Sequence, residues 1–150
     1  MKKEKYKEIV INKCFGGFEL SHKAIMRYAK LSGFPLYAYT EYAYTDKRDK
    51  EGNLLSSNLP QSKRMVEIKN LTGEEHIIHY YKDRNFKKYF WDNDIKRDNK
   101  ILVKVVKELK EEANGYCAEL KIVKIPADVR YEIEEYDGIE SIHEEHKSWG

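Results

Sequence analysis

Cysteine is scarce in this chain, since Cys14 and Cys117 are the only two among 150 residues. They do not form the spaced framework that small secreted domains use for disulfide bonds. Each lies beside a segment that we expect to be a buried strand. The sequence therefore predicts free thiols and a reducing compartment, and it argues against a disulfide-stapled secreted domain.

Long apolar runs are also missing. No stretch approaches the length of a membrane span, and no apolar signal-peptide segment follows the lysine-rich start. Mean hydropathy is −0.81 and 36% of the residues are charged, so we expect a cytoplasmic protein without a membrane partner. Hydrophobic residues still make up 41% of the chain, which is enough for a core and argues against disorder.

The familiar nucleotide-binding and catalytic signatures are absent as well. The chain contains neither G-x-x-x-x-G-K-[ST] nor G-x-G-x-x-G. Cys14 could act as a nucleophile with His22 nearby, but no third orienting group is evident. His143 and His146 could bind a metal only with further ligands that the sequence does not place. We therefore expect no catalytic residues, no metal and no cofactor, and we lean against enzyme activity.

Short apolar runs alternate with two capped amphipathic segments. Their order, β-α-β-β-β-α-β-β, predicts an α+β fold with one mixed β-sheet of five to six strands and two main helices packed on it. We expect a single domain over residues 1–150. Two helices leave one face of such a sheet thinly covered, so we also expect a homo-oligomer.

Both helices have recognisable boundaries. The helix expected near residues 21–32 has Ser21 as its N-cap and Gly33 at its C-terminal end. The helix expected near residues 98–114 is capped by Asp98. Its apolar stripe comprises Ile101, Leu102, Val105, Val106, Leu109 and Ala113. We expect Val105 and Leu109 of this stripe to be buried against the sheet.

The strands are predicted from apolar runs between turn residues. They cover Glu8 to Cys14, Leu36 to Tyr44, Met65 to Leu71, Glu75 to Tyr81, Glu119 to Ile125 and Val129 to Glu135. The third and fourth are expected to form a hairpin around Thr72-Gly73. Residues 46–60 are expected to be a loop. Tyr136-Asp137-Gly138 is expected to be a turn, followed by a short strand or helix from Ile139 to Trp149.

A double glycine lies where the first strand meets the first helix. Gly16 and Gly17 could expose backbone N–H groups to an anion, although they could equally supply only positive φ angles. Arg97 could contribute an anion contact from the start of the second helix. We therefore expect one shared ligand pocket, for which the candidate residues are Cys14, Gly16, Gly17, Ser21, Arg97, Tyr136 and Asp137.

Charge is distributed unevenly along the chain. Residues 82–110 carry ten Lys or Arg against five acids, and residues 132–145 carry seven acids with no Lys or Arg. These segments are either solvated faces or partners of each other in the fold, and the alternative is a surface that steers a charged partner. Aromatic side chains within 82–110 leave nucleic-acid binding open. The acids of residues 132–140 are expected to form an exposed polar edge.

Several motifs resemble those of a widespread family of small bacteriophage and prophage proteins. They are V-I-N-K-C-F-G-G-F-x-L-S, I-x-R-D, E-A-N-G, L-K-I-V-x-I-P-x-D-V, E-I-x-E-Y-D-G and H-x-S-W. The resemblance covers roughly residues 8–33 and 92–150, while residues 34–91 match nothing. Glu19 and Asn99 depart from the usual residues of the family. The resemblance implies an accessory role in the cytoplasm of a host cell and brings no catalytic residues.

Three functions remain open from the sequence. The first is a non-enzymatic binding module for a host factor or a small anionic, nucleotide-type ligand, with counter-defence as one form of that role. The second is a small nucleotide-processing enzyme. The third is a nucleic-acid-binding protein that uses the basic aromatic segment 82–110.

Overall fold

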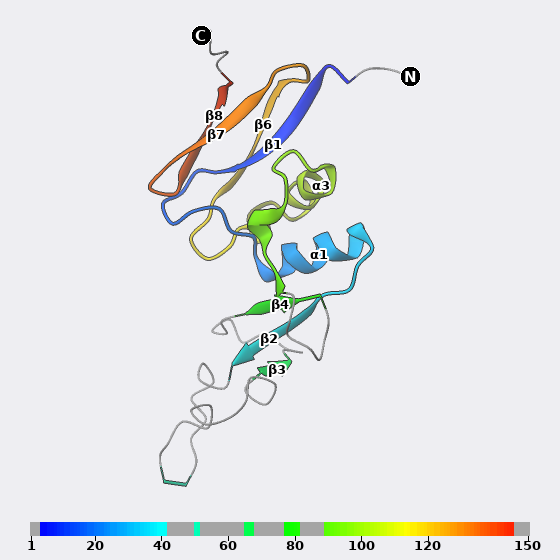
Figure 1. Cartoon of the computed structure of the whole chain (residues 1–150), viewed down its shortest axis with the longest axis vertical. Coiled ribbons are helices and arrows are strands. Elements are labelled where there is room, and N and C mark those ends of the chain that lie inside the picture. Colours follow the sequence, from blue (N-terminus) through cyan, green and yellow to red (C-terminus); the bar gives the residue numbers. More distant parts are fainter. Residues whose placement is uncertain (1–3, 42–49, 52–64, 68–76, 82–88, 146–150) are drawn as a thin grey trace, which may run out of the picture. The chain divides into compact units, whose positions relative to one another are not determined.

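The computed structural model describes residues 4–41, 50–51, 65–67, 77–81 and 89–145 (Figure 1). The predicted α+β class is confirmed, and the described residues include two α-helices and several antiparallel strands. The chain divides into two compact units. Unit 1 comprises Met1–Ser32 with Asp92–Gly150, and unit 2 comprises Gly33–Trp91. The motifs that carry the family resemblance lie in unit 1. The single domain stays a prediction.

Unit 1 contains most of the described secondary structure. Its elements are β1 (Tyr6–Asn12), α1 (His22–Ser32), the 3-10 turn η2 (Asp92–Asp94), α3 (Lys100–Leu109), the 3-10 turn η3 (Lys110–Ala113), β6 (Leu120–Pro126), β7 (Tyr131–Tyr136) and β8 (Ile139–Glu144). The final element is thus a strand. None of the helices in the described residues is long and apolar enough to cross a membrane.

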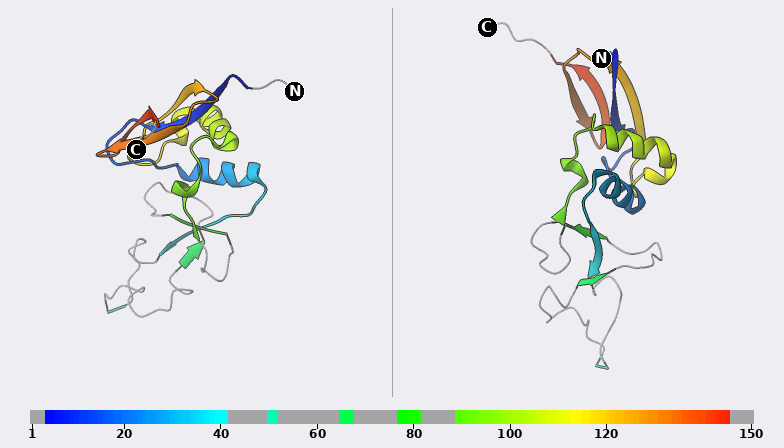
Figure 2. Two further views of the ribbon diagram at one scale, coloured as in Figure 1. Left: turned by 45° about the horizontal axis from the view of Figure 1, so that its top comes forward. Right: turned by 90° about the vertical axis from the view of Figure 1, so that its right-hand side faces the viewer.

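The strands of unit 1 form two separate antiparallel ribbons. β1 pairs with β6 from Tyr6 opposite Pro126 to Asn12 opposite Leu120. β7 pairs with β8 through a two-residue turn at Asp137-Gly138, as the sequence predicts. β8 lies beside β1 without a backbone ladder between them, and β1 lies between β8 and β6 (Figure 2, right). The expected single sheet is therefore replaced by small sheets.

Strand β1 and the helices α1 and α3 provide the core of unit 1. α3 packs on β1, and α1 packs on α3. The fully buried side chains include Ile9, Val10, Ile11, Leu102 and Val105. Val105 is completely buried as predicted, whereas Leu109 near the end of the stripe is half-buried.

Side-chain hydrogen bonds identify the N-cap residue of each helix. Ser21 caps α1 as predicted, because its Oγ accepts from the Ala24 N–H at 3.1 Å. The N-cap of α3 is Asn99 and not Asp98. The Asn99 Oδ1 accepts from the N–H groups of Ile101 and Leu102 at 2.9 and 3.1 Å. Asp98 is engaged elsewhere, in a hydrogen bond with Tyr131.

Unit 2 holds a four-stranded antiparallel sheet in the order β3-β2-β4-β5. Its strands are β2 (Tyr37–Glu41), β3 (Met65–Glu67), β4 (Ile78–Tyr80) and β5 (Tyr89–Phe90). The predicted hairpin between the third and fourth strands is wrong, because β2 lies between them and pairs with both. The Thr72-Gly73 turn and nearly all of the predicted loop over 46–60 lie outside the described residues.

Candidate functional site

Three loops of unit 1 meet at one end of its β-ribbons. They are the loop of residues 13–20, the loop of residues 114–119 and the Asp137-Gly138 turn. We name the exposed surface that they form the three-loop surface. It contains five of the seven sequence-predicted site residues, which are Cys14, Gly16, Gly17, Asp137 and, at the end of β7, Tyr136.

The loops approach so closely that glycine is required at their contacts. A Cβ on Gly16 would lie 2.5 Å from the Cβ of Cys117, and a Cβ on Gly138 would lie 2.5 Å from the backbone nitrogens of Gly16 and Gly17. Gly138 also has a φ of 89°, which favours glycine. The predicted meeting of the double glycine with the Asp137 turn is therefore present. Gly138 lies against the two amides that an anion would have to approach.

The side chain of Asn12 connects the three loops through hydrogen bonds. Its side chain is completely buried at the end of β1. Its Oδ1 accepts from the N–H groups of Cys14 and Glu119 at 3.2 and 2.9 Å. Its Nδ2 donates to the carbonyls of Cys14 and Gly138, both at 2.7 Å. Sequence reasoning missed this residue, and the only signal for it was a polar side chain at the end of an apolar strand.

Arg97 takes part in an ion pair with Glu140. Its Nη1 and Nη2 donate to Oε1 and Oε2 of Glu140 at 2.6 and 2.9 Å. The side chains are 15% and 6% exposed, and the Arg97 guanidinium carbon lies 3.5 Å from the centre of the Phe18 ring. The predicted anion contact is thus already paired within the protein. Glu140 is buried and does not join the exposed polar edge that the sequence predicts.

Ser21 and Asp92 form hydrogen bonds at the place where the loop of residues 13–20 meets α1. Ser21 donates from Oγ to the Glu112 carbonyl at 2.5 Å, which adds to its capping role. The carboxylate of Asp92 accepts from the Leu20 N–H at 2.8 Å. Burial raises the pKa of Asp92, while the Leu20 N–H opposes that rise. Sequence reasoning did not single out Asp92, because its partner lies far away along the chain.

Both cysteines lie in loops of the three-loop surface. Cys14 is half-buried and Cys117 is exposed, and both are free thiols, as predicted. Within the described ranges, no three His, Cys, Asp or Glu side chains come close enough to hold a metal ion. His146 lies outside those ranges.

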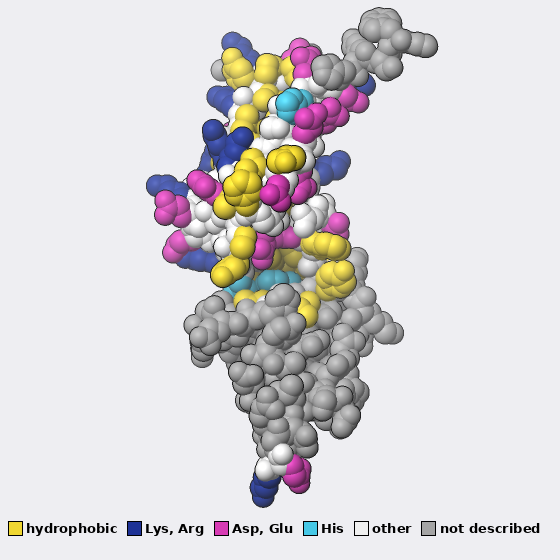
Figure 3. Space-filling view, turned by 90° about the vertical axis from the view of Figure 1, so that its left-hand side faces the viewer, with side chains coloured by type: hydrophobic (Ala, Val, Ile, Leu, Met, Phe, Trp, Pro, Cys, Tyr) yellow, Lys and Arg dark blue, Asp and Glu magenta, His cyan; other side chains and the backbone are white. Residues whose placement is uncertain are grey.

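Large aromatic side chains stand out from the three-loop surface. Phe15 is 63% exposed, Tyr136 is 84% exposed and Tyr116 is 97% exposed, one on or beside each loop. The face of unit 1 in Figure 3 shows hydrophobic side chains exposed among acidic and basic ones. Burial in a partner is the usual way in which such aromatic area is removed from water.

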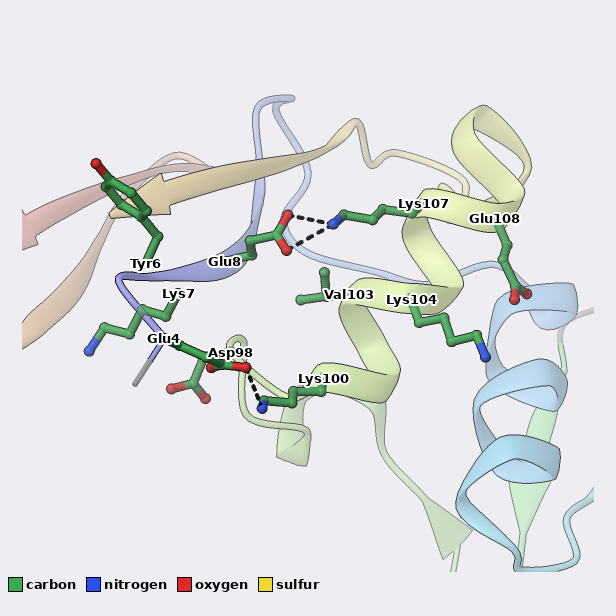
Figure 4. Close-up of a pocket in the computed structure, with 10 residues that line it drawn as sticks. All are labelled: Glu4, Tyr6, Lys7, Glu8, Asp98, Lys100, Val103, Lys104, Lys107 and Glu108. Carbon is green, nitrogen blue, oxygen red and sulfur yellow. Dashed lines mark hydrogen bonds and ion pairs between the residues drawn. The ribbon is translucent and has the colours of Figure 1, made fainter. Parts of the chain in front are cut away.

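A cavity of about 520 Å³ lies elsewhere in unit 1, between β1 and α3 (Figure 4). Two ion pairs connect its walls, Lys100 with Glu4 at 2.9 Å and Lys107 with Glu8 at 2.7 Å. Lysines and carboxylates are equally numerous in its lining. The cavity therefore offers no strong preference for a ligand of either charge.

No family model, curated protein or solved structure matches this chain.

Proposed function

We propose that the chain is a non-enzymatic binding module of phage or prophage origin, and that its three-loop surface binds a protein of the host cell. The observation that carries the proposal is the exposure of Phe15, Tyr116 and Tyr136 on or beside three loops, of which the loop of residues 13–20 contacts the other two. Binding residues concentrate on loops that a rigid scaffold positions. Tyrosine is also enriched among the residues that dominate protein–protein binding energy.

The support for a protein partner is stronger than that for a small anion. The amides of Gly16 and Gly17 face Gly138, and the Arg97 guanidinium is paired with Glu140. An anion at this place would have to displace the turn or compete with a buried carboxylate. A protein surface could cover the aromatic rings with no such rearrangement.

The support for nucleic acid is also weaker. Along α3, Lys100 and Lys107 are paired with Glu4 and Glu8 of the first strand region, which reduces the positive field of this helix. Residues 82–88, the most basic part of the segment, lie outside the described residues.

An affinity capture from host-cell extract tests the proposal. The bait proteins are the natural chain, the triple variant Phe15→Ser/Tyr116→Ser/Tyr136→Ser, and the control Tyr89→Ser, which changes an exposed aromatic residue of unit 2. Matched melting temperatures must first show that all three baits are folded.

We expect one host protein to bind the natural chain and the Tyr89→Ser control but not the triple variant. The purified partner should then lose at least about tenfold in affinity for the triple variant, which corresponds to about 1.4 kcal/mol. A partner that binds all three baits equally would contradict the assignment of this surface. A specific complex with a nucleotide and no protein partner would favour the small-ligand alternative.

A further inference from the structure

Strand β6 has an unpaired outer edge in unit 1. The Lys13 N–H donates to the Glu119 carbonyl at 2.8 Å, which sets the alternation of the β1–β6 ladder. The odd-numbered residues of β6 therefore bond to β1, and the even-numbered residues point their N–H and C=O groups outward. In the right-hand view of Figure 2, β6 lies at the edge of the ribbon.

The two ends of this edge offer no free N–H donor to a new strand. The Leu120 N–H donates to Asn114 Oδ1 at 2.9 Å. Pro126 has no N–H, and its carbonyl accepts from the Val129 N–H at 3.2 Å. Between them, the outward backbone groups of Ile122 and Lys124 have no hydrogen-bond partner within the described part of the chain. The open stretch is therefore symmetric about Val123.

We propose that a second copy of this chain pairs with β6 along this edge, antiparallel and with the two-fold axis at Val123. Ile122 of each copy then lies opposite Lys124 of the other, and each of these residues gives one N–H and one C=O. The pairing satisfies every open group of the stretch with about four hydrogen bonds. It joins two β1–β6 ribbons into one four-stranded sheet.

The side chains favour a second copy over an unrelated strand. In this register each lysine faces an aliphatic residue, Lys124 opposite Ile122 and Lys121 opposite Ile125, while Val123 faces itself. Like charges directly opposite each other would destabilise the pair, and this register contains none. Lysines on an edge strand usually protect it from pairing. In the proposed register, the outward N–H and C=O groups are paired, and no lysine of one copy lies opposite a lysine of the other.

Symmetry adds to this argument. A two-fold contact needs one patch that is complementary to itself, and the outward groups of Ile122 and Lys124 on either side of Val123 meet that condition. The contact is short compared with stable dimer interfaces, so the dimer is expected to be weak and to depend on protein concentration.

Disulfide capture tests the register. In a Cys14→Ser/Cys117→Ser background, Val123→Cys should give an intermolecular disulfide on mild oxidation, because directly opposite non-hydrogen-bonded residues have Cα atoms about 4.5 Å apart. The matched control Lys121→Cys should not cross-link to itself, since the two copies of residue 121 lie about 13 Å apart along the strands. A mixture of Lys121→Cys with Ile125→Cys should cross-link again. Equal cross-linking of all single variants, or none at Val123→Cys, would overturn the proposal.

Sedimentation of the natural chain gives the second readout. We expect its average mass to rise towards that of a dimer at concentrations up to about 1 mM. Ile122→Pro removes only an outward N–H and leaves the ladder to β1 intact, so this variant should stay monomeric. A folded Ile122→Pro variant that dimerises like the natural chain would overturn the proposal. A natural chain that stays monomeric would also overturn the proposal, and the β6 edge would then be available only to a strand of another protein.

Discussion

Arg97 and Glu140 join β1 to β8 at the place where a continuous sheet would have a backbone ladder, and the Arg97 Nη1 donates to the Val10 carbonyl at 3.3 Å. The Val10 N–H donates to the Arg97 carbonyl at 2.9 Å, and the Asn12 N–H donates to Glu140 Oε1 at 2.8 Å. Arg97 and Glu140 thus bond to Val10 and Asn12 on the edge of β1 that does not face β6. Glu140 lies two residues after Gly138, which contacts the double glycine.

Removing one partner of this ion pair should destabilise unit 1 strongly. Glu140→Gln leaves the Arg97 charge buried without its counter-charge, which typically costs about 3–5 kcal/mol. Urea denaturation should report this loss in the free energy of unfolding. The control Glu112→Gln breaks an exposed pair with Lys23 and should cost less than about 1 kcal/mol. Equal effects of the two changes would contradict the structural role of the buried pair.

Gly138→Ala should also destabilise the chain, because the new Cβ would meet the backbone nitrogens of Gly16 and Gly17. Gly17→Ala is the matched control, since Gly17 has a φ of 95° but a Cβ added there would have no other atom within 4 Å. The control should cost only the backbone strain of about 1–2 kcal/mol, and Gly138→Ala should cost clearly more. Thermal melts of both variants measure the difference. Similar costs would show that the loops can separate freely.

Val105→Asp should prevent stable folding, because Val105 is completely buried in the face that α3 turns inward. An unpaired carboxylate at such a place costs several kcal/mol. The neighbouring change Lys104→Asp is the control, since Lys104 is exposed on the same helix. Circular dichroism on heating distinguishes the two variants. An unchanged melting temperature for Val105→Asp would contradict the assignment of the helix face.

His22 should make stability depend on pH in the mildly acidic range. Burial lowers its pKa in the folded chain below the usual histidine value of 6.5. The unfolded chain therefore binds a proton more readily, and this contribution to stability is present above pH 6.5 and is lost as the pH falls below it. Compared with His22→Gln, the natural chain should lose more stability between about pH 8 and pH 5. If the natural chain and His22→Gln lose the same stability over this pH range, the prediction is contradicted.

Local chemistry predicted the parts of the fold that depend on neighbouring residues. The Ser21 cap, the burial of Val105 and the Asp137-Gly138 turn follow from side-chain hydrogen bonding, helical periodicity and the freedom of Asp-Gly to adopt positive φ. Asp98 and Asn99 are both good caps, so the choice between them depended on Tyr131, which engages Asp98 from a distant strand.

Long-range pairing was the part that the sequence could not specify. Nothing local to β3 and β4 shows that β2 lies between them. The basic and acidic segments were open to interpretation as mutual partners, and Arg97 with Glu140 is one such pair. The pattern could not tell which of the seven acids is buried. It also could not show that Asn12 reaches residues as distant as Gly138.

Site-specific photo-crosslinking in host cells tests the central claim most directly. A photoreactive phenylalanine analogue replaces Phe15, Tyr116, Tyr136 or, as the control, Tyr89. If the three-loop surface binds a host protein, the first three positions should yield a covalent adduct with the same protein, and Tyr89 should not. No adduct at any of the three positions, or the same adduct at Tyr89, would contradict the account.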